Sequence, residues 1–406
     1  MTSLMPSTPH DQSGSNFHRR SAYVVLFSIA AIVSASAAAV IYAPYLPRLL
    51  TERYPQPQWP SPGSFAVVKG AKAQRIKLDE STKDLPVDAM GRRLFEEKDG
   101  KALLIFQDGK LKLERYAAGV KPSDRFNSYS LVKSLVGVLV LRAHAEERIK
   151  NLEDSIGAYL PELGNAEFPE IPILSILKMR SGVIFEANAA KSAVGQDPKD
   201  IEAMRLNPFG PMARLHMLGL EEIAGKLRTR STDRGRYKYQ NINTSILGGL
   251  LESIYGEPLE SILSAKIWQP AGARSAHWRR HGDNLPVTAY CCLYATPRDW
   301  VQIGKFLINN GEKDGPFLPD KLWKRFLGLD LTYRQIQNGR YGLHLYRNVL
   351  DRAGERLQGP FSYMFGSRGQ VVYLMPERNL VVVRFGQQIQ LLHSTLYSAW
   401  NTVHPK

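Results

Sequence analysis

A serine followed three residues later by a lysine occurs twice in the chain, at Ser130–Lys133 and at Ser175–Lys178. About one or two such matches are expected by chance, so context has to separate them. A serine hydroxyl becomes a strong nucleophile when a neighbouring neutral amine accepts its proton. Ser130 opens an apolar run that ends at Arg142, and we expect this run to form a buried helix.

Residues three apart on a helix share a face, so Lys133 should lie beside the Ser130 hydroxyl. Burial and the positive end of the helix dipole both disfavour the charged form of a lysine in the first helical turn. Such a lysine is a candidate base. The alternative is an N-cap serine followed by a surface lysine, and the spacing alone does not choose between the two.

Tyr-x-Asn also occurs twice, at Tyr239–Asn241 and at Tyr346–Asn348. The first copy precedes a predicted helix, Thr244–Tyr255. Side chains two apart in an extended segment point the same way, so a phenol could relay a proton while the amide orients a carbonyl group. The alternative is a pair of polar loop residues.

Other catalytic chemistries have little support. The chain contains no Gly-x-Ser-x-Gly, no His-Glu-x-x-His and no glycine-rich phosphate loop. His277 and His281 are four residues apart, but Trp278-Arg279-Arg280 lies between them, so we do not expect a zinc site. We predict neither a metal nor an organic cofactor.

The hydrophobic pattern predicts the elements that would hold these residues. Leu103–Gln107 and Lys110–Tyr116 flank Asp108-Gly109 and predict a hairpin, and Gln370–Met375 with Leu380–Phe385 predict a second one near the other end. Residues 145–290 are typical of helices and loops, and a last helix is expected at about 389–402. The predicted fold class is α+β, with an antiparallel sheet built from both ends of the domain, flanking helices and an inserted helical lobe.

The N-terminal part of the 406-residue chain predicts a membrane segment. Ala22–Tyr45 is almost entirely apolar and long enough to cross a bilayer, whereas Ala35-Ser36-Ala37 leaves cleavage of a signal peptide as the alternative. We expect an inner-membrane, single-pass protein whose catalytic domain faces the periplasm. The expected regions are a disordered cytoplasmic tail (1–20), a signal-anchor (21–45), a proline-rich linker (46–64) and a hydrolase domain (65–406).

Composition excludes some partners and leaves one question open. The net charge is +15, but the basic residues are scattered rather than grouped in a nucleic-acid motif, so no nucleic-acid partner is expected. The two cysteines, Cys291 and Cys292, are adjacent, which excludes a disulfide framework. We expect two buried thiols, with a bridge between neighbours as the alternative.

Several short motifs occur in a fixed order. They are Ser130-Leu-Val-Lys133, Leu177-Lys-Met-Arg-Ser-Gly182, Tyr239-Gln-Asn241, Lys266-Ile-Trp-Gln-Pro270, Leu293-Tyr-Ala-Thr-Pro-Arg-Asp-Trp300, Gly366-Ser-Arg-Gly-Gln370, and Pro376 with Leu380-Val-Val-Val383. Over roughly residues 95–400 these motifs resemble the serine β-lactamase and penicillin-binding superfamily. Together they resemble, within it, the branch that contains 6-aminohexanoate-dimer hydrolase and related esterases.

The resemblance implies a β-lactamase/transpeptidase-like fold, with Ser130 as nucleophile, Lys133 as base and Tyr239 as proton relay. It also implies that Asn241 lines the site and that backbone N–H groups of Ser130 and of 365–367 form an oxyanion hole. The third-motif residues Gly366, Ser367, Arg368 and Gly369 would contact the substrate. Many relatives carry a basic residue on that strand, but this chain has Tyr363-Met-Phe-Gly366, and Arg368 is the candidate substitute.

These residues predict a serine hydrolase of the Ser-x-x-Lys type, acting on small-molecule amides or esters through an acyl-enzyme. The site's missing basic residue favours substrates without a carboxylate beside the scissile bond. Two alternatives remain: a β-lactamase or peptidoglycan D-alanyl peptidase, and a catalytically silent binding domain of the same fold.

Overall fold

A computed structural model describes residues 13–72, 76–82, 86–163, 170–185, 208–225, 227–312, 315–390 and 392–405. The chain divides into two compact units, residues 1–51 and 52–406. The larger unit contains all of the predicted chemistry.

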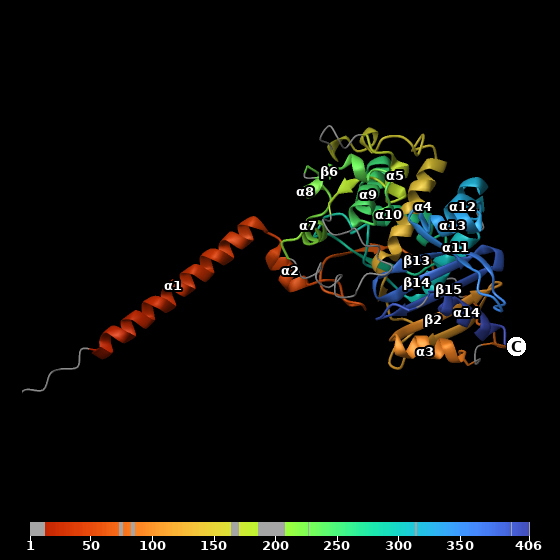
Figure 1. The fold of residues 1–406 in the computed structure, drawn as a ribbon, viewed down its shortest axis with the longest axis horizontal. Coiled ribbons are helices and arrows are strands. Elements are labelled where there is room, and N and C mark those ends of the chain that lie inside the picture. Colours follow the sequence, from red (N-terminus) through yellow and green to blue (C-terminus); the bar gives the residue numbers. More distant parts are fainter. Residues whose placement is uncertain are drawn as a thin grey trace, which may run out of the picture. The chain divides into compact units, whose positions relative to one another are not determined.

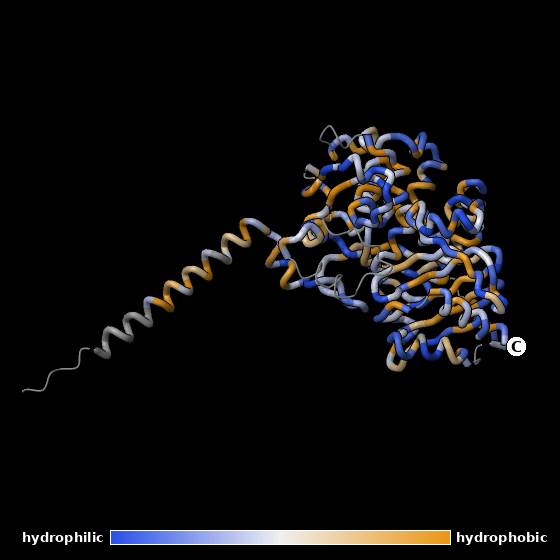
Figure 2. Tube along the Cα trace, viewed as in Figure 1, coloured by the Kyte–Doolittle hydropathy of each residue, from blue (hydrophilic) through white to orange (hydrophobic). Residues whose placement is uncertain are grey.

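The smaller unit is dominated by one helix, α1 (Ser13–Tyr42). Its segment Tyr23–Tyr42 has a mean hydropathy of 2.5 and is not buried inside the protein. It is long and apolar enough to cross a membrane, and a signal sequence meets the same criteria. Figure 2 shows the hydrophobic colouring of this segment. The helix begins inside the predicted disordered tail, because extending a formed helix adds one hydrogen bond per residue. Residues 1–12 of that tail lie outside the described residues.

A seven-stranded antiparallel sheet forms the centre of the larger unit, with the order β11-β12-β13-β14-β15-β2-β3. Both predicted hairpins are confirmed, and strands from the two ends of the domain meet where β15 pairs with β2. The strands are β2 (Gly100–Gln107), β3 (Lys110–Tyr116), β11 (Tyr341–Gly342), β12 (Leu345–Leu350), β13 (Gly359–Gly366), β14 (Gln370–Met375) and β15 (Leu380–Gly386).

Helices cover both faces of this sheet. Side chains alternate between the faces, so Leu104 and Val383 join the core under α11 (Pro297–Ile308), whereas Leu103 and Val382 join the core on the opposite face. That second face carries α3 (Ala89–Glu97) and α14 (Leu392–Val403), the predicted last helix (Figure 1). The α+β class is therefore confirmed.

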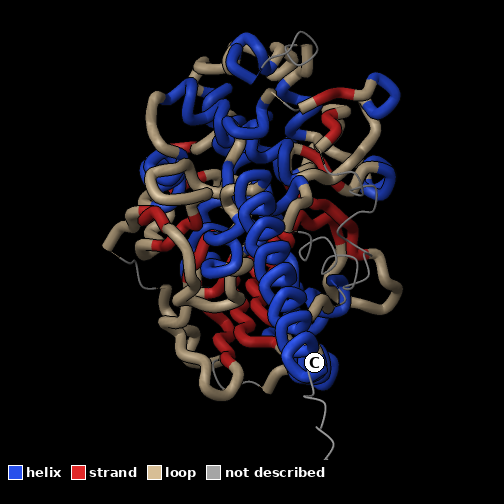
Figure 3. The backbone as a smooth tube through the Cα atoms, turned by 90° about the vertical axis from the view of Figure 1, so that its left-hand side faces the viewer, coloured by secondary structure: helices blue, strands red, loops and turns tan. Residues whose placement is uncertain are grey.

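A mainly helical lobe is inserted between the two groups of strands, as predicted. It occupies the upper part of Figures 1 and 3, away from the large sheet. Its helices include α4 (Val132–Ala145), α5 (Ile173–Leu177), α7 (Pro211–Leu218), α8 (Glu221–Ala224), α9 (Asn241–Tyr255) and α10 (Leu259–Leu263). Further helices, α12 (Asp320–Leu327) and α13 (Tyr333–Asn338), follow α11.

Smaller sheets complete the unit. A four-stranded sheet has the order β1-β7-β8-β4, and its last strand leads directly to Ser130. The remaining strands pair in twos. The bounds are β1 (Phe65–Val68), β4 (Phe126–Asn127), β7 (Ala276–Arg279) and β8 (Leu293–Ala295), with the pairs β5 (Val183–Ile184) and β6 (Arg228–Thr229), and β9 (Gly311–Glu312) and β10 (Gly315–Pro316).

The proline-rich segment after α2 (Leu46–Glu52) is not a free spacer. The Asn127 backbone N–H donates to the Pro57 carbonyl (2.9 Å), and the Tyr294 hydroxyl donates to the Gln56 carbonyl (2.6 Å). Trp59 stacks on His277 at a centroid distance of 4.2 Å. The compact unit therefore starts at Glu52 rather than near residue 65, because backbone carbonyls in a segment without regular structure still need donors.

Candidate active site

Ser130 lies in a short 3₁₀ turn, η1 (Tyr129–Leu131), immediately before α4. The Lys133 amine is hydrogen-bonded to Ser130 Oγ at 2.8 Å and donates to the Tyr290 carbonyl at 2.8 Å. Lys133 is 2% exposed, whereas Ser130 is partly exposed. In its neutral form this amine can donate to the Tyr290 carbonyl and keep its lone pair directed at the serine hydroxyl, which is the geometry that proton removal requires.

The turn that presents Ser130 is held from two sides. Tyr129 has a left-handed backbone (φ 44°), and its N–H donates to the Asn127 side-chain oxygen at 2.8 Å. The Ser128 N–H donates to the Leu293 carbonyl at 2.8 Å, and Ser128 Oγ accepts from the Leu293 N–H at 3.1 Å. A non-glycine residue keeps such a conformation when its surroundings impose it, as they often do at active sites.

The second Ser-x-x-Lys copy has a different environment. Ser175 lies in α5 and Lys178 follows it, but no hydrogen bond joins their side chains among the described residues. Burial lowers the pKa of Lys178, yet without a serine beside it this amine has no nucleophile to activate. Tertiary contacts therefore distinguish the two Ser-x-x-Lys copies, which the local sequence does not.

Tyr239 lies beside the Ser-Lys pair. Lys133 Nζ is 5.2 Å from the centroid of the Tyr239 ring. The residue between Tyr239 and Asn241 is extended (φ −141°, ψ 138°), so the two side chains leave the backbone on the same side. Asn241 begins α9, and its amide nitrogen donates to the Met212 sulfur at 3.3 Å.

The second Tyr-x-Asn copy contributes to the same region. Tyr346, on β12, packs against Tyr239 with 6.2 Å between ring centroids, and Tyr341 packs against Tyr239 at 5.9 Å. Burial raises the pKa of both Tyr341 and Tyr346 well above the ordinary value. The repeated motif was the sequence signal for Tyr346, and tertiary packing of β12 against the segment before α9 brings it to Tyr239.

The end of β13 lies against the nucleophile turn. A Cβ atom at Gly366 would lie 2.4 Å from the Ser128 carbonyl and 3.4 Å from the Ser130 nitrogen, so glycine is required at this position. Ser367 follows directly, at the start of a short turn, η6 (Ser367–Gly369). The strand thus brings backbone groups to the place where the oxyanion hole was predicted.

The remaining third-motif residues are not brought to the nucleophile. The Arg368 guanidinium donates to the Gln387 side-chain oxygen at 2.8 Å, and no contact joins it to Ser130 within the described part of the chain. A Cβ at Gly369 would lie 2.4 Å from the Gln388 carbonyl, so this glycine permits the turn. Met364, at the place of the usual basic residue, is fully buried in the core.

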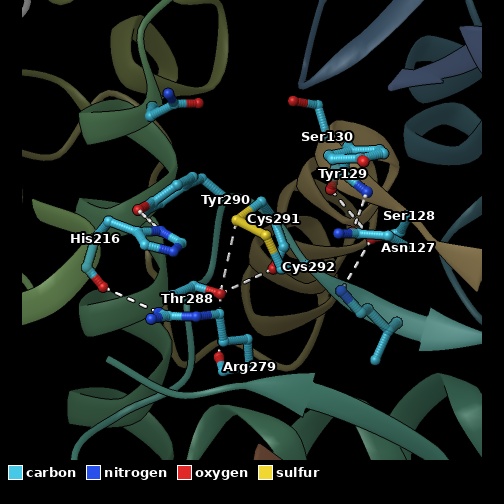
Figure 4. The surroundings of a disulfide bond; sticks show 12 residues. Asn127, Ser128, Tyr129, Ser130, His216, Arg279, Thr288, Tyr290, Cys291 and Cys292 are labelled. Carbon is cyan, nitrogen blue, oxygen red and sulfur yellow. Dashed lines mark hydrogen bonds between the residues drawn. A yellow bond between two sulfur atoms is a disulfide. The ribbon is translucent and has the colours of Figure 1, made fainter. Parts of the chain in front are cut away.

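A disulfide bond joins Cys291 and Cys292 (Figure 4). The prediction of two thiols is therefore wrong. A tight turn brings the neighbouring sulfurs together: Cys292 has a left-handed backbone (φ 73°), and the Cys291 carbonyl accepts hydrogen bonds from Trp278 Nε1 and Thr288 Oγ1, both at 2.9 Å. The disulfide directly follows Tyr290, whose carbonyl holds Lys133.

Tyr290 and its polar support were not predicted from the sequence. The Tyr290 hydroxyl shares a hydrogen bond with His216 Nδ1 at 3.1 Å, as Figure 4 shows. Arg279, which is fully buried, donates to the His216 carbonyl at 3.0 Å and forms an ion pair with Glu52 at 2.9 Å. These residues are distant in the sequence and belong to no short motif, so no local signal could have linked them.

No group of three or more His, Cys, Asp or Glu side chains in the described residues is arranged to hold a metal ion. His277 and His281 have separate environments: His277 stacks on Trp59, and the His281 ring shares a hydrogen bond with the His216 carbonyl at 3.2 Å.

Comparison with known proteins agrees with this geometry. The family model described as Beta-lactamase matches residues 92–390. A 6-aminohexanoate-dimer hydrolase of Paenarthrobacter ureafaciens is 26% identical over 260 residues, which are 61% of this chain and 64% of that protein, so the match spans less than two thirds of this relative.

Solved structures show the same fold. A structure assigned as a 6-aminohexanoate-dimer hydrolase from Bacillus anthracis has a TM-score of 0.65 and 21% identity, covering 84% of this chain and 89% of that one. A β-lactamase/D-alanine carboxypeptidase from Pseudomonas syringae has a TM-score of 0.53 and 14% identity, covering 79% and 98%. With the family match extending over most of the chain, and with the predicted fold in place, the chain belongs to the β-lactamase family.

Proposed function

We propose that the protein is a serine hydrolase that cleaves amide or ester bonds of small substrates through an acyl-enzyme on Ser130. The observation that carries this proposal is the buried Lys133 amine, 2.8 Å from Ser130 Oγ and held by the Tyr290 carbonyl. One relative of this chain is named 6-aminohexanoate-dimer hydrolase, which supports a hydrolytic reaction.

The proposed reaction has two stages. Lys133 takes the hydroxyl proton while Ser130 Oγ attacks the substrate carbonyl carbon, and the resulting oxyanion faces the Ser130 backbone N–H and the end of β13. The proton then passes through the Tyr239 phenol to the leaving nitrogen or oxygen as its bond to carbon breaks. Water next attacks the ester carbonyl of the acyl-enzyme, giving the acid product and restoring Ser130.

The substrate preference follows from the third motif. Met364 occupies the place where many relatives carry a cation, and Arg368 is engaged with Gln387. A charge-assisted hydrogen bond to a carboxylate beside the scissile bond is worth about 1.5–3 kcal/mol. Without it, we expect kcat/KM for short p-nitrophenyl esters to exceed that for a chromogenic cephalosporin by at least about a hundred-fold.

A fluorophosphonate probe and a substrate screen test the proposal. The probe should label the wild type and leave Ser130→Ala unlabelled, since an activated serine is what reacts. The screen should pair p-nitrophenyl esters and the 6-aminohexanoate dimer with a cephalosporin. Absence of labelling would favour a silent binding domain, and efficient cephalosporin turnover would favour a β-lactamase or D-alanyl peptidase.

We also propose that α1 anchors the protein in the inner membrane with the catalytic unit in the periplasm. The apolar segment Tyr23–Tyr42 supports this proposal. Full-length protein should stay with membranes after a carbonate wash, and protease added to spheroplasts should reach the catalytic unit. A mature N-terminus at Ala38 would instead identify the segment as a cleaved signal peptide.

A further inference from the structure

A cavity of about 650 Å³ lies on the α14 face of the large sheet. Five of its fifteen lining residues are tyrosine or phenylalanine, and they come from three segments of the chain. The rings contact one another closely: Tyr341 and Tyr346 have centroids 4.7 Å apart, and Tyr346 stacks on Tyr363 at 5.2 Å. A cavity of this size and lining suits an apolar group of a small organic molecule. The aromatic residues are Tyr237, Tyr341, Tyr346, Tyr363 and Phe365.

The cavity adjoins the proposed catalytic site through two of its wall residues. Two of its wall residues, Tyr341 and Tyr346, pack directly against Tyr239. Phe365 immediately precedes Gly366, which lies against the turn that presents Ser130. In the proposed reaction Tyr239 delivers a proton to the leaving atom, so the leaving group must lie on the Tyr239 side of the nucleophile. The cavity therefore lies on the side of the nucleophile where the leaving group is expected.

The charged groups around the cavity are mostly cationic. None of its lining residues is Asp or Glu, whereas Arg180 and Arg340 both contribute to it. Arg180 is partly fixed, because it donates to the Gly235 carbonyl at 2.6 Å. The exposed Arg340 side chain forms no ion pair or hydrogen bond with the described residues, so its guanidinium is available to a ligand. Among the described residues, Asp351 contacts the cavity lining: it accepts a hydrogen bond from Gln337 at 3.3 Å.

We infer that this cavity binds the leaving group of the substrate, and that the preferred leaving group is an apolar chain or ring that ends in a carboxylate paired with Arg340. This inference rests on the proposed function and specifies its substrate class. The carboxylate would lie far from the scissile bond. Such a substrate needs no cation beside the scissile bond, where this chain has Met364.

A matched pair of acetyl esters tests the inference. The esters 3-(4-acetoxyphenyl)propanoate and 3-(4-acetoxyphenyl)propanamide have the same acyl group and nearly the same phenol, but only the first has a distal negative charge. For the wild type we expect kcat/KM to be about tenfold higher for the carboxylate, the effect of one charge-assisted contact of modest strength. This preference should shrink in 0.5 M salt, because Arg340 is exposed.

Variants assign the preference to one side chain. Arg340→Gln should bring the ratio of the two kcat/KM values close to one. Arg334→Gln, which removes an exposed arginine from the neighbouring α13 that does not line the cavity, should keep it. Equal rates for the two esters in the wild type, or a preference that survives Arg340→Gln, would overturn the inference and leave the hydrolase proposal standing. Failure to cleave either ester, together with absent fluorophosphonate labelling, would overturn both.

Discussion

The Tyr290 carbonyl accepts a hydrogen bond from Lys133 Nζ at 2.8 Å, so the residue that precedes the disulfide holds the amine that contacts Ser130. This contact joins the start of a helix to a turn that lies 157 residues later in the chain. It fixes the amine between two oxygen atoms and makes the geometry of the 288–293 turn part of the proposed catalytic machinery.

Replacing the nucleophile should abolish turnover without unfolding the protein. Ser130→Ala removes the hydroxyl that the Lys133 amine contacts, and a partly exposed serine contributes little to packing. Ester hydrolysis should fall by at least about 10³-fold while the circular dichroism spectrum is unchanged. Ser175→Ala is the matched control and should retain nearly full activity. A Ser130→Ala enzyme with wild-type rates would contradict the mechanism.

Lys133→Arg should be nearly inactive, because guanidinium does not deprotonate in the working pH range and cannot accept the serine proton. Lys178→Arg, in the other Ser-x-x-Lys copy, should be active. The measurement is kcat/KM for a p-nitrophenyl ester, with thermal unfolding of each variant to verify folding. If Lys133→Arg keeps most of its activity, Lys133 is not the base.

Removing the disulfide should slow the reaction while the protein still folds. Without the bond between Cys291 and Cys292, the turn that carries the Tyr290 carbonyl gains freedom, and the Lys133 amine is positioned less accurately. We expect kcat to fall about tenfold in the double variant Cys291→Ser with Cys292→Ser, since small displacements of reacting groups are costly. Unchanged kcat would show that the hydrogen bonds of Thr288 and Trp278 alone hold the turn.

The Asn127 side chain should matter for the rate through the Tyr129 backbone. Asn127→Ala leaves the buried Tyr129 N–H without the acceptor that now lies at 2.8 Å, which should cost about 1–3 kcal/mol in stability and lower kcat. Tyr294→Phe is the control, because it removes the hydroxyl that donates to Gln56 and accepts from Asn127 Nδ2 (3.2 Å) but keeps the Asn127 oxygen that accepts from Tyr129. It should lower the melting temperature with little effect on kcat. Equal kcat losses in the two variants would refute a specific role for Asn127.

His344 should make the fold sensitive to acid. It is buried between Thr244 (3.0 Å) and the Leu177 carbonyl (2.8 Å), and burial lowers its pKa to about 4. Between that value and the ordinary 6.5, the unfolded chain binds more protons than the folded one, so stability falls as pH falls. The loss from this residue should approach roughly 3 kcal/mol at pH 4.

Urea unfolding at pH 7 and pH 5 measures this effect, with His344→Asn as the comparison, since asparagine does not titrate in that range. The free energy of unfolding should drop more between the two pH values in the wild type than in the variant. An identical drop in both proteins would mean that other groups cause the acid sensitivity.

Local patterns in the sequence determined much of the fold. Alternating apolar residues around Asp108-Gly109 predicted the β2–β3 hairpin, and the uninterrupted apolar run after Ser130 predicted a buried helix, because both signals arise from residues close together in the chain. The spacing of Ser130 and Lys133 also predicted their shared face, since one helical turn brings them together.

Only the tertiary structure decided what surrounds that pair. Both Ser-x-x-Lys copies have the same local spacing, but Tyr290, Tyr239 and Gly366 meet at the first copy and not at the second. The attachment of residues 56–59 to Asn127 and the tyrosine cluster around Tyr346 likewise depend on segments far apart in the chain. Such contacts leave no periodic signal in the sequence, because they form when distant elements pack together and satisfy each other's polar groups.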